Sequence, residues 1–127
     1  AAELGDPLAM LNLGIAYEHG RGVEKDLEQA VKYYRQAAER GQTVAQFQLG
    51  TMYANGIQVE QSYAKALEWF QLAAEANYAD AEWAIANMYE RGYAVPVDRT
   101  EAVAWYLKAA EHGSQRAKER LEKLKAD

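Results

Sequence analysis

Cysteine is absent from this chain of 127 residues. Without thiols the chain can form neither a disulfide nor a thiolate zinc site, and it has no cysteine nucleophile. It also has no uninterrupted apolar run close to the roughly 18 residues that a transmembrane helix requires. These absences exclude a disulfide-stabilised scaffold and membrane insertion.

Positive charge is scarce as well. The chain carries 14 lysine and arginine residues against 19 aspartate and glutamate residues, for a net charge of −5. Surfaces that bind nucleic acids or anionic membranes need clustered basic residues that displace counterions. We therefore expect neither nucleic acid nor membrane as a partner.

Proline and phenylalanine are rare, with 2 residues each, whereas alanine fills 25 positions. Alanine has the highest helix propensity of all residues, and its small side chain lets helices approach closely. The composition therefore predicts an all-α protein.

The sequence repeats itself every 36 residues. Residues 37–41 recur as 73–77 and as 109–113, with no insertion or deletion between the copies. Further positions keep the same register: Ala9, Ala45, Ala81 and Ala117; Leu13, Leu49, Ile85 and Leu121; Tyr17, Tyr53 and Tyr89; Gly20, Gly56 and Gly92. The step predicts one repeat domain over residues 1–127, with repeats at 1–36, 37–72 and 73–108 and a capping helix at 109–127.

Each repeat contains the signals of two helices. Asp6 followed by Pro7 can begin a helix and Gly20 can end it, which predicts a first helix at about residues 7–19. Asp26 begins a second helix that runs to about residue 39. One hairpin cannot bury its apolar face alone, so we expect a right-handed α-solenoid of antiparallel helix hairpins.

The start of the second helix has a recognisable pattern. Asp26 is followed three residues later by Gln29, and Asp98 by Glu101, which predicts a capping box in the first and third repeats. Ser62 takes the same position in the second repeat.

These positions resemble the Sel1-like repeat family, a relative of the tetratricopeptide repeat, over essentially the whole chain. In the first repeat the match comprises Ala9, Leu13-Gly14, Tyr17, Gly20-Arg21-Gly22-Val23, Asp26, Ala30, Tyr33-Tyr34 and Ala37-Ala38-Glu39-Arg40-Gly41. The chain departs from the pattern at Gln58, where the second glycine of the loop is expected, and at Ala94 in the third repeat. The resemblance implies an adaptor that holds peptides or proteins on the inner surface of a superhelix, of a kind common in bacterial envelope and signalling systems.

Residues with catalytic chemistry are few. His19 and His112 stand at a helix end and in a turn, where we expect them to be solvated, and they cannot assemble a metal site without cysteine. Ser62 and Ser114 occupy helix N-cap positions, where hydroxyls accept hydrogen bonds from the backbone. We therefore expect no catalytic residue, no metal and no cofactor, and predict that the protein is not an enzyme.

Aromatic residues recur at the repeat period and are expected to form the core between helices. They are Tyr17, Tyr53 and Tyr89; Tyr33, Trp69 and Trp105; and Tyr34, Phe70 and Tyr106. The small residues Gly14, Gly50 and Ala86 recur too, and we expect each to let the first helix of the neighbouring repeat approach closely.

The face of the first helix opposite Leu13 is the predicted inner groove, taking 100° per residue. Its candidate partner-binding residues are Leu8, Leu11, Ile15, Glu18, Phe47, Thr51, Asp80, Trp83, Asn87 and Glu90. The expected ligand carries aliphatic or aromatic side chains toward the first repeat and a lysine or arginine toward the third. The alternative is that Leu11, Phe47 and Trp83 pack laterally on adjacent helices.

The sequence therefore predicts a non-catalytic adaptor or scaffold that binds a protein or peptide on its concave face. The alternative is a structural spacer or assembly segment cut from a longer repeat protein, or a repeat array made to study folding. Because residues 1–5 match the end of a second helix, we expect excision from a longer array, and a monomer or weak end-to-end association. The bacterial periplasm and the cytoplasm are both compatible with the sequence.

Overall fold

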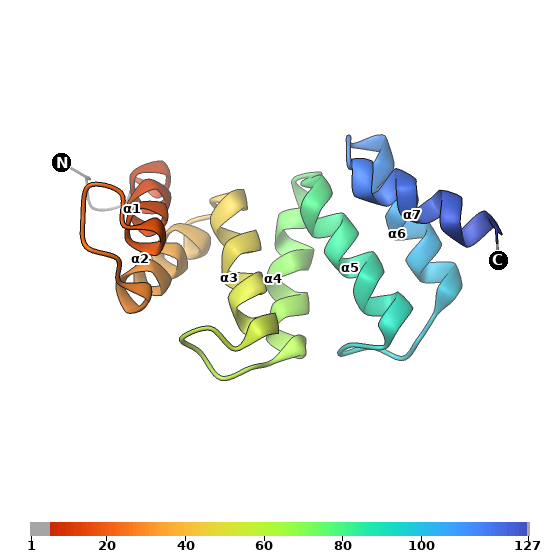
Figure 1. The fold of residues 1–127 in the computed structure, drawn as a ribbon, viewed down its shortest axis with the longest axis horizontal. Coiled ribbons are helices and arrows are strands. Elements are labelled where there is room, and N and C mark those ends of the chain that lie inside the picture. Colours follow the sequence, from red (N-terminus) through yellow and green to blue (C-terminus); the bar gives the residue numbers. More distant parts are fainter. Residues whose placement is uncertain (1–5, 127) are drawn as a thin grey trace. The chain divides into compact units, whose positions relative to one another are not determined.

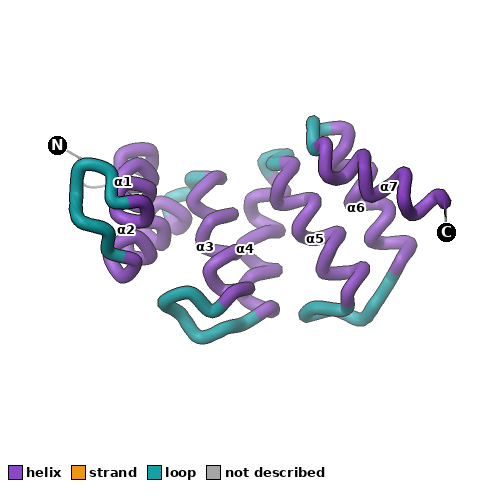
Figure 2. Tube along the Cα trace, viewed as in Figure 1, coloured by secondary structure: helices purple, strands orange, loops and turns teal. Residues whose placement is uncertain are grey.

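The computed structural model describes residues 6–126, and this part of the chain contains seven helices and no strand (Figures 1 and 2). The helices are α1 Pro7–His19, α2 Leu27–Glu39, α3 Thr43–Asn55, α4 Tyr63–Glu75, α5 Ala79–Arg91, α6 Arg99–Glu111 and α7 Gln115–Ala126. The prediction of an all-α protein is confirmed. Residues 1–5, on which the expectation of excision rests, lie outside the described residues.

The chain forms two compact units, residues 1–66 and 67–127, with the division inside α4. In the first unit, α2 packs against both α1 and α3. In the second unit, α6 packs against both α5 and α7 in the same way. We call α1, α3, α5 and α7 the A helices and α2, α4 and α6 the B helices, since they alternate along the chain.

The predicted helix boundaries of the first repeat are confirmed, because the expected residues cap the helices. Asp6 Oδ1 accepts a hydrogen bond of 3.1 Å from the backbone N–H of Leu8, and Pro7 occupies the first helical position. Gly20 ends α1 with φ of +71°, a left-handed conformation that glycine adopts without steric cost.

The loop from A helix to B helix is closed by a backbone hydrogen bond in every repeat. The N–H of Asp26 donates to the carbonyl of Tyr17, at 2.9 Å. Ser62 and Asp98 make the equivalent bonds to Tyr53 and Tyr89, also at 2.9 Å. The prediction of a full capping box is therefore wrong, because the N–H that a Gln29 or Glu101 side chain would accept from is already used.

The same loop keeps its conformation where glycine is replaced. Gly22 has φ of +74°, and the corresponding residues Gln58 and Ala94 have φ of +58° and +66°. A side chain in this left-handed region costs about 1–3 kcal/mol. The loop-closing hydrogen bonds of Ser62 and Asp98 are among the contacts that offset this cost.

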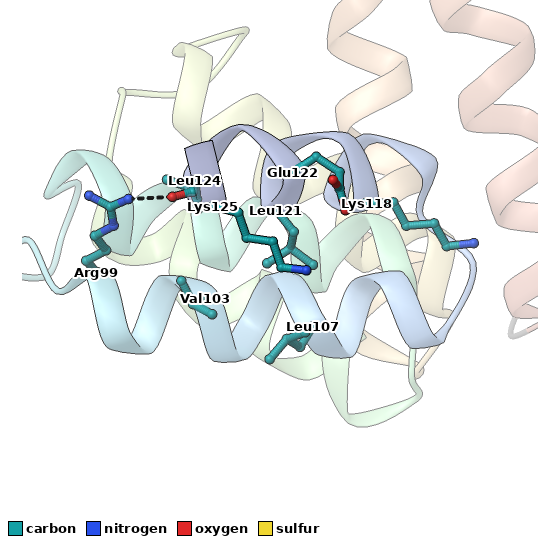
Figure 3. Close-up of a pocket in the computed structure, with 8 residues that line it drawn as sticks. All are labelled: Arg99, Val103, Leu107, Lys118, Leu121, Glu122, Leu124 and Lys125. Carbon is teal, nitrogen blue, oxygen red and sulfur yellow. Dashed lines mark hydrogen bonds between the residues drawn. The ribbon is translucent and has the colours of Figure 1, made fainter. Parts of the chain in front are cut away.

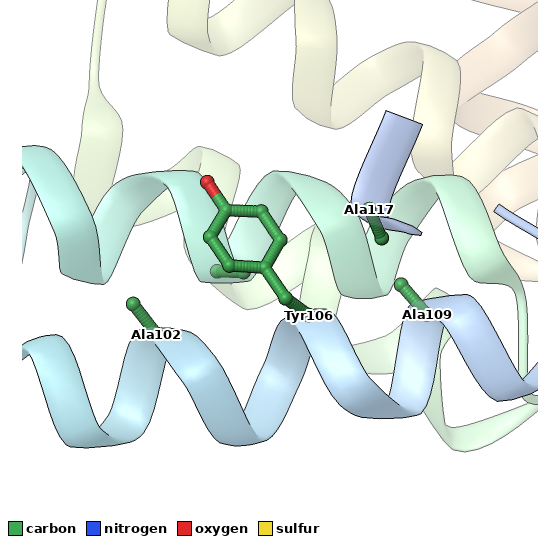
Figure 4. Packing of buried hydrophobic residues seen from close by; sticks show 5 residues of the cluster. Ala102, Tyr106, Ala109 and Ala117 are labelled. Carbon is green, nitrogen blue, oxygen red and sulfur yellow. The ribbon is translucent and has the colours of Figure 1, made fainter. Parts of the chain in front are cut away.

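Alanine and tyrosine fill the core of the second unit. Ala86, Ala102, Tyr106, Ala109 and Ala117 are fully buried. Figure 4 shows the ring of Tyr106 directed from α6 toward α5, and Ala117 facing Ala109. The small methyl groups bring the helix backbones close together, which explains why the composition favours alanine.

Gly14 permits a close approach of α1 and α2. A Cβ atom at Gly14 would lie 2.8 Å from Cδ1 and Cε1 of the buried Tyr34 ring, closer than van der Waals contact allows. The small residue thus accommodates the B helix of its own repeat. The expectation that Gly14 faces the neighbouring A helix is wrong, because the tyrosine of the same hairpin fills that space.

Replacing Gly14→Leu should therefore force α1 away from Tyr34. We expect the free energy of unfolding to fall by about 1–3 kcal/mol, which is the usual cost of overpacking. Asn12→Leu is the matched control, because it adds an aliphatic side chain to an exposed position of the same helix. Urea unfolding followed by circular dichroism measures both variants, and equal stability of the two would contradict the assignment.

Candidate functional site

The predicted partner-binding residues of α1 do not share one exposed face. Leu8 is 57 % exposed, and Ile15 and Glu18 are half-buried. Leu11 is only 5 % exposed and belongs to the core, so the prediction that it lines an open groove is wrong. The prediction took Leu13 as the centre of the buried face, but Leu13 is only half-buried. The buried face of α1 lies about one residue, or roughly 100°, around the helix from the predicted one.

On α3, the two predicted residues are half-buried. The hydroxyl of Thr51 donates to the carbonyl of Phe47 at 3.0 Å, one turn earlier in the same helix. This internal bond already uses the hydroxyl hydrogen of Thr51, which cannot then be donated to a ligand. Phe47 contributes apolar surface and Thr51 chiefly its methyl group.

The predicted acidic residue Glu18 is engaged by the core of its own hairpin. The hydroxyl of the fully buried Tyr34 donates to the Glu18 carboxylate. Burial raises the pKa of the Tyr34 hydroxyl, and the neighbouring carboxylate raises it further. Glu18 therefore satisfies a buried donor.

The third repeat repeats this arrangement with Tyr106, whose hydroxyl donates to Glu90 Oε1 at 2.7 Å. The second repeat has Ala54 and Phe70 at the two corresponding positions. At these two positions, glutamate on the A helix thus occurs only in the repeats that have tyrosine on the B helix. This pairing indicates that Glu18 and Glu90 serve as hydrogen-bond acceptors for the tyrosine hydroxyls.

A pocket of about 280 Å³ lies between α5 and α7, and we call it the α5/α7 pocket. Its lining residues are Trp83, Asn87, Glu90, Arg91, Tyr106, Arg116, Glu119, Arg120 and Lys123. It brings together three of the four residues predicted on α5. The fourth, Asp80, is reached by the same helix α7, because Arg116 lies 3.7 Å from its carboxylate.

Arginines of α7 dominate this pocket. The Arg116 guanidinium carbon lies 4.1 Å from the centre of the Trp83 ring, within the range of a cation–π contact. Arg120 forms an ion pair with Glu90 and donates from Nε to Oε1 at 3.1 Å. These bonds hold the pKa of the Glu90 carboxyl below its usual value, an effect that the Tyr106 hydroxyl reinforces and burial opposes.

The expected lysine or arginine of a ligand would therefore compete with arginines of this chain at Asp80 and Glu90. Both carboxylates are paired with arginines of the same chain. The basic side chain of the ligand stays a prediction, and the arginines of α7 are charges that the sequence of α5 alone does not show.

Both histidines are exposed, as expected, but His112 also contacts a buried carboxylate. Its Nδ1 lies 2.7 Å from Oε1 of Glu82, a carboxylate that is only 2 % exposed. The earlier repeats have Met10 with Arg40 and Gln46 with Ala76 at these positions. Pairing the two columns of the repeat could have revealed the contact, since only the third repeat has ionisable residues at both positions.

A second pocket, of about 430 Å³, lies between α6 and α7 (Figure 3). Its walls include the apolar side chains of Val103, Leu107 and Leu121. Arg99 Nη2 closes one end by donating to the carbonyl of Leu124 at 3.0 Å. This pocket was not predicted, and Leu107 stands where the preceding repeats have arginine and glutamine.

Two kinds of feature are absent from residues 6–126. No group of three or more histidine and acidic side chains could hold a metal ion among these residues. No helix in this stretch is long and apolar enough to cross a membrane.

Comparison with known proteins supports the repeat assignment. The family model described as Sel1 repeat matches residues 7–42, 43–78 and 79–114, in steps of 36 residues that begin six residues later than the predicted boundaries. A comparison with curated proteins finds no match.

Solved structures from bacteria show the same fold. A Sel1 repeat protein from Oxalobacter formigenes is 41 % identical, with a TM-score of 0.85 over 89 % of this chain and 46 % of its own. The protective antigen c5321 of uropathogenic Escherichia coli, which displays an SLR fold, has the same identity and TM-score over 89 % of this chain and 24 % of its own. Helicobacter pylori cysteine rich protein B is 22 % identical, with a TM-score of 0.71 over 87 % of this chain and 90 % of its own. The chain thus spans less than half of the first two relatives.

The bond between Tyr34 and Glu18 can be tested by a double-mutant cycle. Glu18→Ala should lower the free energy of unfolding by about 1–3 kcal/mol, because the buried hydroxyl loses its acceptor. The double variant with Tyr34→Phe reproduces the Ala54 and Phe70 pair of the second repeat and should recover part of this loss. Additive losses in urea unfolding would contradict a bond between the two residues.

The lowered pKa of Glu90 predicts a pH dependence of stability. Its contribution is present above the usual value of 4.5 and is lost as the pH falls through the lowered value. We expect Glu90→Gln to be about 1 kcal/mol less stable than the parent at pH 7 and nearly equal to it in strong acid. Glu119→Gln is the control, because Glu119 lines the same pocket and forms no ion pair with a described residue. Urea midpoints across this range decide the outcome, and a difference independent of pH would contradict it.

Proposed function

Because the chain belongs to the Sel1 repeat family, we propose that it is a binding module that holds a peptide or protein segment on the exposed sides of its A helices. Sel1 repeats commonly mediate protein interactions. In the first unit this surface is the open side of α1 and α3, and in the second unit it is the open side of α5 and α7.

The observation that carries this proposal is the apolar character of α1 and α3. Apolar side chains lie around the whole circumference of both helices, whereas α2 has one apolar and one charged face. A helix that is apolar on all sides is normally buried on all sides. On α1, however, Leu8 is largely exposed and Ile15 is half-buried, so apolar surface remains for a ligand.

The second unit supplies a different surface. Its A helices place the Trp83 ring, the Asn87 amide and several charged side chains around one pocket. Aromatic and arginine side chains often dominate the energy of protein interfaces. A ligand of the second unit would thus meet polar contacts, whereas a ligand of the first unit would meet apolar surface.

The two serine hydroxyls of the chain give little support to a catalytic function. The Ser62 and Ser114 hydroxyls accept hydrogen bonds from the N–H groups of Lys65 and Ala117, both at 3.1 Å. They therefore serve as helix caps, as predicted. The Sel1 repeat fold is also generally non-catalytic.

The test begins with affinity purification of partners on the full chain, followed by calorimetric titration of each recovered partner. We expect the double variant Leu8→Ser, Ile15→Ser to lose about 1–3 kcal/mol of binding free energy, because it removes apolar contacts at the interface. Lys32→Ala is the control, since Lys32 is exposed on the B helix α2.

Melting temperatures of the same variants separate binding from folding. The proposal requires a loss of affinity while most of the protein remains folded at the titration temperature. If every recovered partner binds the double variant as tightly as the parent, the exposed apolar side of α1, which carries the proposal, is not the binding surface and the proposal fails.

A further inference from the structure

The α5/α7 pocket has an excess of positive charge. Four cationic side chains line it, against the two carboxylates of Glu90 and Glu119. Arg120 is neutralised by Glu90. Arg91 and Lys123, by contrast, form no ion pair with any residue in the described part of the chain. This local excess stands out in a protein whose net charge is −5.

The positive side chains are specific to this end of the chain. Arg116, Arg120 and Lys123 lie on α7 at intervals of four and three residues, which places them on one side of the helix. The corresponding positions of α3 hold Val44, Gln48 and Thr51. The positive stripe therefore does not follow from the packing pattern that all repeats share.

Arg116 is the best-positioned donor of the group. Its guanidinium lies against the Trp83 ring, and its distance of 3.7 Å to Asp80 is too long for a hydrogen bond. It makes no hydrogen bond to any other residue that the structure describes. A planar guanidinium held against a ring presents its N–H groups at the edge, in the fork that matches a carboxylate.

We propose that the α5/α7 pocket binds the carboxylate of an aspartate or glutamate side chain in a peptide ligand. The N–H groups of Arg116 donate to the carboxylate. The side chains of Arg91 and Lys123 attract it, and the Asn87 amide is available as a further donor. The inference rests on the proposed function and specifies its ligand chemistry in the second unit.

Three peptides test the charge of the ligand. Each has seven residues, acetylated and amidated ends and a central position between two leucines, which is glutamate, glutamine or lysine. Binding to the full, ¹⁵N-labelled chain is followed by NMR through the indole N–H of Trp83, with those of Trp69 and Trp105 as internal references. We expect the glutamate peptide to shift the Trp83 signal and to bind at least fivefold more tightly than the other two.

Two variants of α7 form a matched pair. Lys123→Glu reverses a charge in the pocket and should weaken the glutamate peptide at least fivefold. Lys118→Glu makes the same change at the other pocket, between α6 and α7. Figure 3 shows the Lys118 ammonium group directed away from that cavity. This variant should leave the affinity unchanged. Arg116→Ala should weaken binding at least as much as Lys123→Glu, while Arg116→Lys should restore only part of it, because lysine keeps the charge without the fork.

Several results would overturn the inference. They are no shift of Trp83 with the glutamate peptide, equal or tighter binding of the lysine peptide, and equal loss in Lys118→Glu and Lys123→Glu. A glutamine peptide with a free C-terminus that binds better than the amidated glutamate peptide would assign the pocket to a terminal carboxylate instead. All variants are compared by melting temperature, so that loss of the fold is not read as loss of binding.

The outcome is distinguishable from that of the proposed function. If recovered partners depend on Leu8 and Ile15 but the glutamate peptide does not bind, only the carboxylate inference fails. If the glutamate peptide binds at Trp83 but the affinity of recovered partners does not depend on the A helices of either unit, the proposed function fails and the inference about carboxylate binding is retained.

Discussion

The contact between a B-helix tyrosine and a small residue on the A helix sets the spacing of the hairpins in the first and third repeats. In the first repeat the Tyr34 ring lies where Gly14 has no side chain, and in the third Tyr106 is buried in one cluster with Ala86. Once the two helices are this close, the tyrosine hydroxyl reaches the last turn of the A helix. A glutamate in that turn can accept the hydrogen bond of the tyrosine hydroxyl. The loop between the two helices can then close, because the N–H of the B-helix N-cap residue donates to a carbonyl of the A helix. The spacing thus determines which side of the A helix remains open.

Features that depend on short segments were predicted well from the sequence. The caps at Asp6 and Ser114 and the stop at Gly20 each involve residues a few positions apart, so that local chemistry determines them. The open face of α1 was predicted at the wrong position, because the prediction assumed that Leu13 is buried and Leu13 is only half-buried. In a helix that is apolar on every side, periodicity cannot say which apolar side is buried, and neighbouring helices decide it.

Contacts between different helices account for most of the remaining differences. Arg116 and Arg120 approach α5 from the following A helix: Arg116 is 36 residues from Asp80 along the chain, and Arg120 is 30 residues from Glu90. The pair of Glu82 and His112 has the same sequence separation. A search within single helices finds none of these. Comparison of whole repeat columns is more powerful, since Tyr34 with Glu18 and Phe70 with Ala54 show that two positions change together.

The energetics of Arg116 connect the fold with function. An ion pair as exposed as that of Arg116 and Asp80 contributes at most about 1 kcal/mol to stability, and its length of 3.7 Å leaves it without a hydrogen bond. The contact with Trp83 is worth a similar amount at an exposed site. Arg120, in contrast, neutralises a carboxylate that a buried tyrosine requires, so its place in the fold has a structural reason. A contribution to stability therefore accounts for the presence of Arg120 better than for that of Arg116. Within residues 6–126, Arg116 has N–H donors without a hydrogen-bond partner beside an aromatic ring, and the proposed contact with a ligand accounts for it better.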